Sequence, residues 1–128
     1  MIMSKKFNIK ILNGTFSVCK FKNMEHFNFN VQNENFLSIT KTNDEVSVIC
    51  EEKLSVGAIK CEKNWKILKI NSQLDFSLIG IISTITKKLA EANIPVFVIS
   101  TYNTDYFLIK KDMLDETIDA LNEICDFN

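Results

Sequence analysis

Arginine is absent from this chain of 128 residues, and all 15 of its basic side chains are lysines. Arginine supplies the planar, two-pronged donor with which proteins bind phosphate and guanine bases. Its absence, together with a formal net charge of −1, argues against a site that reads nucleic-acid sequence. Glycine is scarce as well, and the three glycines are too dispersed for a loop that cradles phosphate. We therefore expect no nucleic-acid partner.

Long apolar runs and paired cysteines are also missing. No stretch reaches the roughly 18 uninterrupted apolar residues of a membrane span, and Asn8, Lys10 and Asn13 interrupt the segment behind the first lysines. The cysteines are Cys19, Cys50, Cys61 and Cys125, without a Cys-x-x-Cys spacing. We expect a cytoplasmic protein without membrane contact, in which the four cysteines are reduced and mostly buried thiols.

Catalytic groups are equally sparse. His26 is the only histidine, and it lies in an asparagine-rich stretch where no pattern supports a dyad with a cysteine. One histidine and scattered cysteines do not have the spacing of a metal centre. The sequence therefore predicts a protein that is not an enzyme, with no catalytic residue, no metal and no cofactor.

The second half of the chain has a clear helical pattern. Apolar residues recur at helical spacing between Ser77 and Ala92. They are Leu78, Ile81, Ile82, Ile85, Leu89 and Ala92. Asp75 or Ser77 can cap the start of this helix, and Asn93 with Pro95 ends it.

Strands are predicted on both sides of that helix. Trp65–Asn71 is a short strand candidate before it. Ile94–Thr101 is a continuous apolar run, which predicts a central strand buried on both faces. Tyr106–Ile109 is a further strand, joined by a tight connection.

A last helix follows these strands. Asp112 is its expected cap, and Asp115 stands at the acidic position of a capping box. Its buried stripe is expected to be Leu114, Ile118, Leu121 and Cys125. The second half thus reads strand, helix, strand, strand, helix.

The first half repeats this order less clearly. Phe7–Leu12 and Thr15–Phe21 alternate as strands do, separated by a turn at Asn13–Gly14. The asparagine-rich stretch Asn23–Asn35 is a loop or a stunted helix.

Phe36–Thr40 and Val46–Cys50 form a second hairpin, which matches the later one at an offset of 61 positions. The matched pairs are Phe36 with Phe97, Thr40 with Thr101, Asp44 with Asp105, and Val48 with Ile109. This repetition favours an ancient duplication.

One strand is missing from a four-stranded βαββαβ layer of ferredoxin-like type. After the last helix at most three residues remain, so we expect the missing strand to come from the first half, at Phe7–Leu12. The expected fold is therefore α+β, ferredoxin-like, with strands shared between an abbreviated first half and the second half.

Three ordered motifs identify a family resemblance. They are D-F-S-x-x-G-I at 75–81, L-A-E-A-x-I-P at 89–95 and I-S-T-Y-x-T-D-Y at 99–106. Together they resemble the second half of small bacterial proteins with paired ACT domains. The regulatory regions of aspartate kinases and the cytosolic arginine sensors of eukaryotes are similar at greater distance. The resemblance implies tandem ACT domains, with 1–60 as a degenerate ACT-like half and 61–128 as an ACT domain.

The resemblance also implies a pocket for a free amino acid where ACT units meet. The residues carried over to this pocket are Phe76, Ser77, Leu78, Gly80 and Ile81, at the opening of the helix, and Thr101, Tyr102, Thr104 and Asp105, after the following strand. A helix N-terminus suits a carboxylate, and an aspartate suits an ammonium group or a basic side chain.

Four of these residues also have a purely structural interpretation. Ser77 is a plausible helix cap, Gly80 allows close packing, Asp105 can bond the local backbone, and Tyr102 is a surface turn residue.

Three hypotheses about function follow. The first is a regulatory module that binds an amino acid effector at an ACT–ACT interface, as a homodimer, and signals to a protein target in trans through conformational or oligomeric change. The second is a ligand-free ACT module that only pairs with itself or with another protein. The third is a catalytic role, which needs an acid–base pair that the sequence does not reveal.

Overall fold

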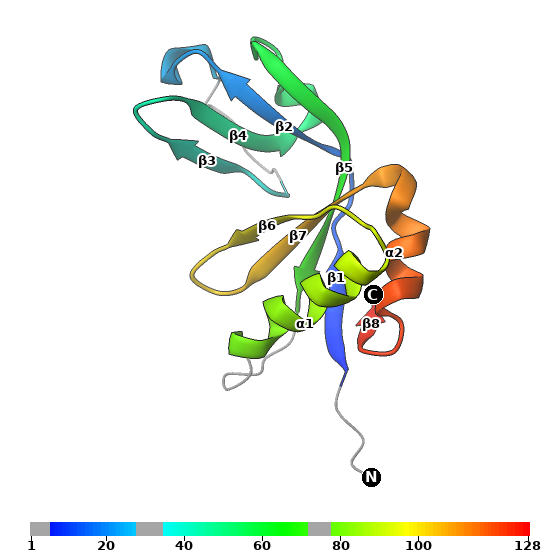
Figure 1. Cartoon of the computed structure of the whole chain (residues 1–128). Coiled ribbons are helices and arrows are strands. Elements are labelled where there is room, and N and C mark those ends of the chain that lie inside the picture. Colours follow the sequence, from blue (N-terminus) through cyan, green and yellow to red (C-terminus); the bar gives the residue numbers. More distant parts are fainter. Residues whose placement is uncertain (1–5, 28–34, 72–77) are drawn as a thin grey trace. The chain divides into compact units, whose positions relative to one another are not determined.

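The computed structural model describes residues 6–27, 35–71 and 78–128, and the chain packs into two compact units (Figure 1). Unit 1 combines Met1–Leu12 with Lys66–Asn128, so it draws on both ends of the chain. Unit 2 is continuous and comprises Asn13–Trp65. The first strand of the chain therefore belongs to the same unit as the last helix.

Unit 2 is built mainly from short strands. β2 (Phe16–Phe21) lies between β4 (Val46–Glu51) and β5 (Lys60–Ile70), and β3 (Ser38–Lys41) pairs with the other edge of β4. These pairings are all antiparallel. The order β3-β4-β2-β5 is that of a four-stranded ferredoxin-like sheet.

One buried cluster of unit 2 lies on one face of this sheet, because alternate side chains of a strand point to the same face. Its buried members are Cys19, Phe21, Phe27, Val46, Val48 and Cys50. Phe27 meets Phe21 edge to face, with ring centroids 5.3 Å apart. Short 3-10 turns, η1 (Met24–His26) and η2 (Glu52–Leu54), follow β2 and β4. The predicted loop or stunted helix at 23–35 is thus a short helical turn in its described part.

Unit 1 repeats the sheet order with helices added. β6 (Phe97–Ser100), β7 (Asp105–Lys110), the second part of β5, β1 (Phe7–Ile11) and β8 (Cys125–Phe127) lie side by side in that sequence. α1 (Leu78–Glu91) and α2 (Leu114–Leu121) both lie on one side of these strands (Figure 1).

One core joins both helices of unit 1 to its sheet. Its buried residues are Ile9, Leu68, Ile70, Ile81, Ile85, Leu89, Ile94, Phe107, Ile109, Leu121 and Cys125. The predicted helical stripe supplies three of them, Ile81, Ile85 and Leu89. α1 ends at Glu91, and Asn93 follows with a left-handed φ of 59°, as its predicted role in ending the helix requires.

The missing strand of unit 1 is β1, as the sequence predicted. β1 pairs antiparallel with β5, with Ile9 opposite Ile70 and Ile11 opposite Leu68. Each unit therefore holds the four strands of a ferredoxin-like layer, and β5 takes part in both. The predicted α+β class with shared strands is confirmed.

β5 is longer than the predicted strand Trp65–Asn71, because it begins at Lys60. Its first part pairs with β2, where Phe16 faces Trp65 and Val18 faces Glu62. This register shift marks a β-bulge, and Asn64 within it has a left-handed φ of 68°. The bulge lies next to the boundary between the two units.

The prediction of a central, doubly buried strand at Ile94–Thr101 is wrong. Among the described strands β6 pairs only with β7, so it is an edge strand, and it spans only Phe97–Ser100. Phe97 is 39% exposed. An apolar run does not distinguish a central strand from an edge strand that keeps part of its apolar surface open.

The prediction for the last helix also needs correction. α2 ends at Leu121, and Cys125 opens β8 instead of continuing the helix. Cys125 is nevertheless 2% exposed and lies in the core, because β8 pairs in parallel with β1. Contrary to expectation, the C-terminus thus adds a strand beyond β1. Asp112 does not cap α2: it lies in the 3-10 turn η3 (Lys111–Met113).

The internal repeat is present, but its offset is not 61. The register pairs Lys41 with Val46 across one hairpin and Ser100 with Asp105 across the other. The counterpart of Asp105 is therefore Val46 rather than Asp44, and the offset is 105 − 46 = 59. An error of two residues in the offset keeps each side chain on the same face of the strand, so the sequence pattern alone did not reveal the error.

Candidate functional site

The candidate effector corner of unit 1 is where β5 ends and the β6–β7 turn comes back to it. The Thr104 hydroxyl donates a hydrogen bond of 2.8 Å to the carbonyl oxygen of Ile70, the last residue of β5. The segment that leads from this point to α1 contains Phe76 and Ser77, which lie outside the described residues. This hydrogen bond holds the β6–β7 turn at the end of β5.

The described part of the opening of α1 contains two predicted site residues with opposite surroundings. Gly80 is exposed, and a Cβ added to it meets no described atom within 4 Å. Close packing against the sheet is therefore not the reason for glycine there. Ile81 is fully buried among the core residues of unit 1. Leu78 is the first residue of α1.

Hydrogen bonds of its own hold the β6–β7 turn, residues 101–104, in shape. The Thr101 amide and hydroxyl both donate to the Thr104 carbonyl oxygen, at 2.8 and 3.0 Å. The Thr101 hydroxyl thus bonds within the turn, and the Thr104 hydroxyl bonds the turn to Ile70 of β5. Tyr102, at the tip, is fully exposed.

Asp105 is the buried carboxylate of this corner. It is 8% exposed, and its Oδ1 accepts a hydrogen bond of 2.6 Å from the Ser100 hydroxyl across the hairpin. Burial of an ionised carboxylate is costly unless hydrogen bonds or a cation compensate it. A carboxylate is a good acceptor for an ammonium group, which forms a stronger, charge-assisted hydrogen bond than a neutral donor such as the Ser100 hydroxyl.

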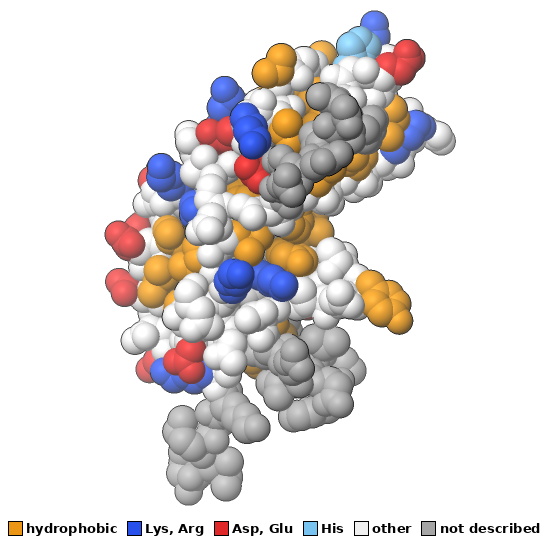
Figure 2. Space-filling model, turned by 180° about the vertical axis from the view of Figure 1, so that it is seen from behind, with side chains coloured by type: hydrophobic (Ala, Val, Ile, Leu, Met, Phe, Trp, Pro, Cys, Tyr) orange, Lys and Arg blue, Asp and Glu red, His pale blue; other side chains and the backbone are white. Residues whose placement is uncertain are grey.

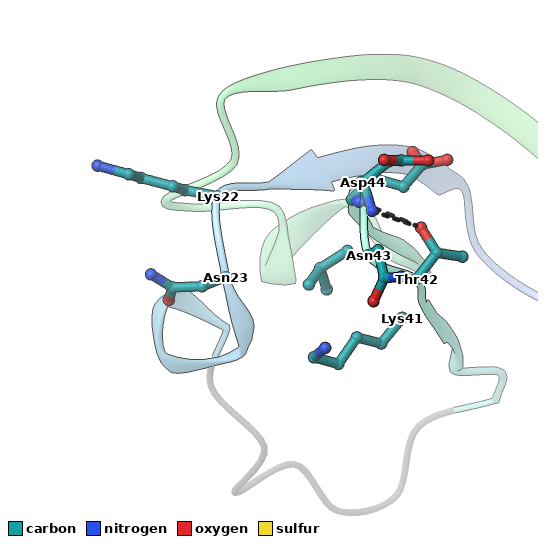
Figure 3. Close-up of a pocket in the computed structure, with 8 residues that line it drawn as sticks. Lys22, Asn23, Lys41, Thr42, Asn43 and Asp44 are labelled. Atoms are coloured by element: carbon teal, nitrogen blue, oxygen red, sulfur yellow. Dashed lines mark hydrogen bonds between the residues drawn. The ribbon is translucent and has the colours of Figure 1, made fainter.

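Unit 2 has a shallow pocket of about 170 Å³ beside its own β3–β4 turn (Figure 3). Lys41 and the turn residues lie on one side of the pocket, and Lys22 and Asn23, which follow β2, lie on the other. The lining of the pocket thus includes two cationic side chains, Lys22 and Lys41, and the carboxylates of Asp44 and Glu45. Lys22 extends away from the turn in this view (Figure 3).

This pocket occupies the place in unit 2 that the effector corner occupies in unit 1. Each turn has four residues and begins with a threonine, Thr42 or Thr101, whose amide donates to the carbonyl oxygen of the last turn residue. The distances are 2.9 Å in unit 2 and 2.8 Å in unit 1. The Thr42 hydroxyl accepts from the amides of Asp44 and Glu45, so it too is committed to its turn.

A cluster of thiols in unit 2 is a feature that sequence reasoning missed. Cys19 and Cys61 lie directly opposite each other on β2 and β5, with their Sγ atoms 2.9 Å apart. Cys50 lies in the same core cluster. Spacing along the chain gave no signal, because strand pairing, not sequence proximity, brings these cysteines together.

The surface and the remaining side chains add few other candidates. On the face in Figure 2, lysine and acidic side chains occur in small, mixed groups, without the continuous basic surface that binds nucleic acid. In the ranges that the structure describes, no three histidine, cysteine or acidic side chains are grouped to hold a metal ion. No helix of the described ranges is long and apolar enough to cross a membrane.

Comparison with known families identifies the architecture. A family model described as an ACT domain matches residues 60–123, which is half of the chain. The chain belongs to the ACT domain family. A second family model, described as an N-terminal domain, matches residues 14–55 of this ACT protein. The predicted resemblance is therefore confirmed.

Solved structures agree with this assignment. A crystal structure of an Agobacterium tumefaciens protein matches with a TM-score of 0.85 and 26% identity, over 98% of this ACT chain and 94% of that chain. Aspartate kinase of Clostridium acetobutylicum, described as an allosteric enzyme, matches with a TM-score of 0.61 and 12% identity, over 93% of this chain and 33% of that chain. A domain assigned as the C-terminal regulatory domain of aspartate kinase from Porphyromonas gingivalis matches with a TM-score of 0.57 and 14% identity, over 94% of this chain and 97% of that chain. The last two likenesses show the fold alone.

Proposed function

We propose that this ACT protein is a non-catalytic regulatory module that binds a free amino acid at an interface between ACT units and signals through a conformational or oligomeric change. ACT domains are regulatory modules, which supports the general role. The hydrogen bond from Thr104 to Ile70 carries the more specific proposal, because it holds the β6–β7 turn at the end of β5, where the chain leaves for α1.

The chemistry of this corner suits a zwitterion. The N-terminal end of a helix such as α1 favours a carboxylate, and the exposed side of Gly80 lets a ligand approach the backbone. Asp105 supplies the opposite charge for the ammonium group of the ligand. Phe76, Ser77, Leu78 and Ile81 complete the proposed wall, and Thr101 and Tyr102 border it.

A thermal-shift screen of the full chain against the twenty amino acids tests the proposal. A bound effector raises the melting temperature by mass action, and at 100 times its Kd the gain is about 2.7 kcal/mol. We expect Asp105→Asn to lose most of this ligand-dependent shift, since it keeps the shape of the side chain but removes its charge.

Ser100→Ala is the matched control, because it removes the 2.6 Å hydrogen bond to Asp105 and leaves the carboxylate in place. This variant should be somewhat less stable but should still respond to the ligand. If no amino acid at millimolar concentration shifts the melting temperature of the unaltered chain, effector binding is refuted. If Lys41→Gln loses the response instead, the binding site is the pocket of unit 2.

A second candidate, a ligand-free pairing module, is favoured by one observation. The apolar edge strand β6 has Phe97 39% exposed, and among the described strands β6 pairs only with β7. Open strand edges readily pair with another chain. A chain that dimerises but responds to no amino acid would match this candidate.

A further inference from the structure

The thiols of unit 2 lie in a geometry that allows a covalent link. Cys19 on β2 faces Cys61 on β5 in antiparallel register, with Lys20 facing Lys60 as the next pair. Directly opposite residues have Cα atoms about 4.5 or 5.5 Å apart, depending on the hydrogen-bonding pattern. Both separations fall within the roughly 4.4–6.8 Å range of disulfides. The backbone therefore needs no rearrangement to join these two residues.

We propose that Cys19 and Cys61 are a redox modification site, which closes reversibly to a cross-strand disulfide when a peroxide reaches Cys61. The Sγ atoms already lie 2.9 Å apart, so side-chain rotation alone can bring them to bonding distance, about 2.05 Å. Nothing in the proposed effector binding uses these residues, so the site is independent of it.

The different exposure of the two thiols determines which of them an oxidant reaches first. Cys61 is partly exposed, whereas Cys19 is 2% exposed. Burial raises the pKa of the Cys19 thiol well above its usual range, and the neighbouring Cys61 and Cys50 raise it further. Cys19 is therefore a protonated, shielded thiol near neutral pH, and Cys61 is the sulfur that an oxidant meets first.

Two steps account for all atoms and electrons. The sulfur of Cys61 attacks one peroxide oxygen, the O–O bond breaks, and Cys61 becomes a sulfenic acid while one molecule of water or alcohol leaves. The sulfur of Cys19 then attacks the sulfenic sulfur, the S–O bond breaks, and the hydroxyl leaves as water with the thiol proton of Cys19. Two electrons pass from the sulfur pair to the peroxide, and a dithiol reductant returns them.

Cys50 is a less suitable partner in spite of its proximity. The register of β2 and β4 places Ser17 opposite Cys50 and Cys19 opposite Val48, so Cys50 lies diagonally from Cys19. The Cys50 thiol also lies within hydrogen-bonding reach of the Cys19 thiol. The Cα atoms of diagonal neighbours across an antiparallel pair are about 7–8 Å apart, however, which is beyond the disulfide range. The structure thus favours one specific pair among three clustered thiols.

The test treats the reduced full chain with hydrogen peroxide and digests it without reductant. We expect the intact protein to lose the mass of two hydrogen atoms, the free thiols to fall from four to two, and one linked peptide pair to contain Cys19 and Cys61. Dithiothreitol should restore all four thiols. The oxidised form should also melt higher, because the link closes a long loop in the unfolded chain.

Two variants sharpen the result. Cys61→Ser should lose the link, and because Cys61 is only partly buried, this variant should still fold. Cys125→Ser is the matched control, because Cys125 lies in the core of unit 1, and it should form the Cys19–Cys61 link as the unaltered chain does. A link that includes Cys50, a disulfide between two chains, or Cys61 that stops at sulfenic or sulfinic acid would overturn the proposal.

Discussion

At the scale of single residues, Gly80 lies in the helix α1 at a point where a side chain would contact no described atom. Glycine in a helix costs roughly 0.5–1 kcal/mol relative to alanine, because it loses more backbone freedom on folding. A Cβ at this position meets no described atom within 4 Å, so the described residues impose no steric penalty on an alanine there. The cost of this glycine in α1 is consistent with a functional reason for keeping it.

We therefore expect Gly80→Ala to raise the free energy of unfolding by up to about 1 kcal/mol, as measured by urea denaturation. Ala90→Gly, at an exposed position of the same helix, is the reciprocal control and should lower it by a similar amount. If an effector approaches the bare Cα, Gly80→Ala should also weaken the ligand-dependent thermal shift. A less stable variant would contradict our account of the open side of Gly80.

Some residue roles could be predicted from sequence and others could not. The role of Asn93 in ending α1 follows from local chemistry, since asparagine tolerates a left-handed φ. The bond from Ser100 to Asp105 and the contact of Cys19 with Cys61 could not be predicted, because both depend on cross-strand register.

At the scale of elements, β6 is the clearest departure from expectation. Its composition is that of an interior strand, but it lies at the edge of the sheet of unit 1. Natural edges are often protected by charged residues, especially lysine, and β6 has none in Phe97–Ser100. This strand is therefore the element of unit 1 best suited to pair with a second copy.

We expect Ile99→Lys to weaken self-association at least tenfold, as measured by sedimentation equilibrium, because a lysine at the edge disfavours strand pairing. Tyr102→Lys adds the same charge in the exposed turn outside the strand and should leave self-association unchanged. Equal dissociation constants for the two variants would show that β6 is not the pairing edge.

The predictability of the elements followed the strength of their periodicity. α1 and the hairpin strands have regular patterns over several turns or alternations and were predicted to within a few residues. The predicted last helix is longer than α2, because Cys125 continues the apolar spacing of the helix although its backbone belongs to β8. Burial is the same in either conformation, so the apolar pattern did not distinguish them.

At the scale of the whole molecule, β1 gives the N-terminus a structural role in the C-terminal unit. Ile9 is 1% exposed in the core of unit 1, and β8 obtains its pairing from β1. Removal of this strand exposes one edge of β5 and leaves β8 without that support. The ACT fold of residues 66–128 thus depends on a segment that lies far away in sequence.

A chain that lacks residues 1–12 should therefore lose cooperative unfolding of unit 1, with hydrogen-exchange protection of α1 amides reduced by several orders of magnitude. Loss of Ile9 alone accounts for about 2–5 kcal/mol by analogy with buried Ile→Ala substitutions. A chain that lacks only residues 1–5 is the control and keeps β1 whole. Near-normal protection in the longer truncation would show that β1 is dispensable.

The bulged part of β5 also contains a natural fluorescence probe. Trp65, the single tryptophan of the chain, is 8% exposed and faces Phe16 on β2, close in sequence to Cys61. Indole emission depends on the polarity and packing around the ring, so intrinsic fluorescence reports mainly on the β2–β5 ladder. Spectroscopy without an added dye can therefore follow that ladder as peroxide acts on it, and can time its unfolding separately from that of the helices.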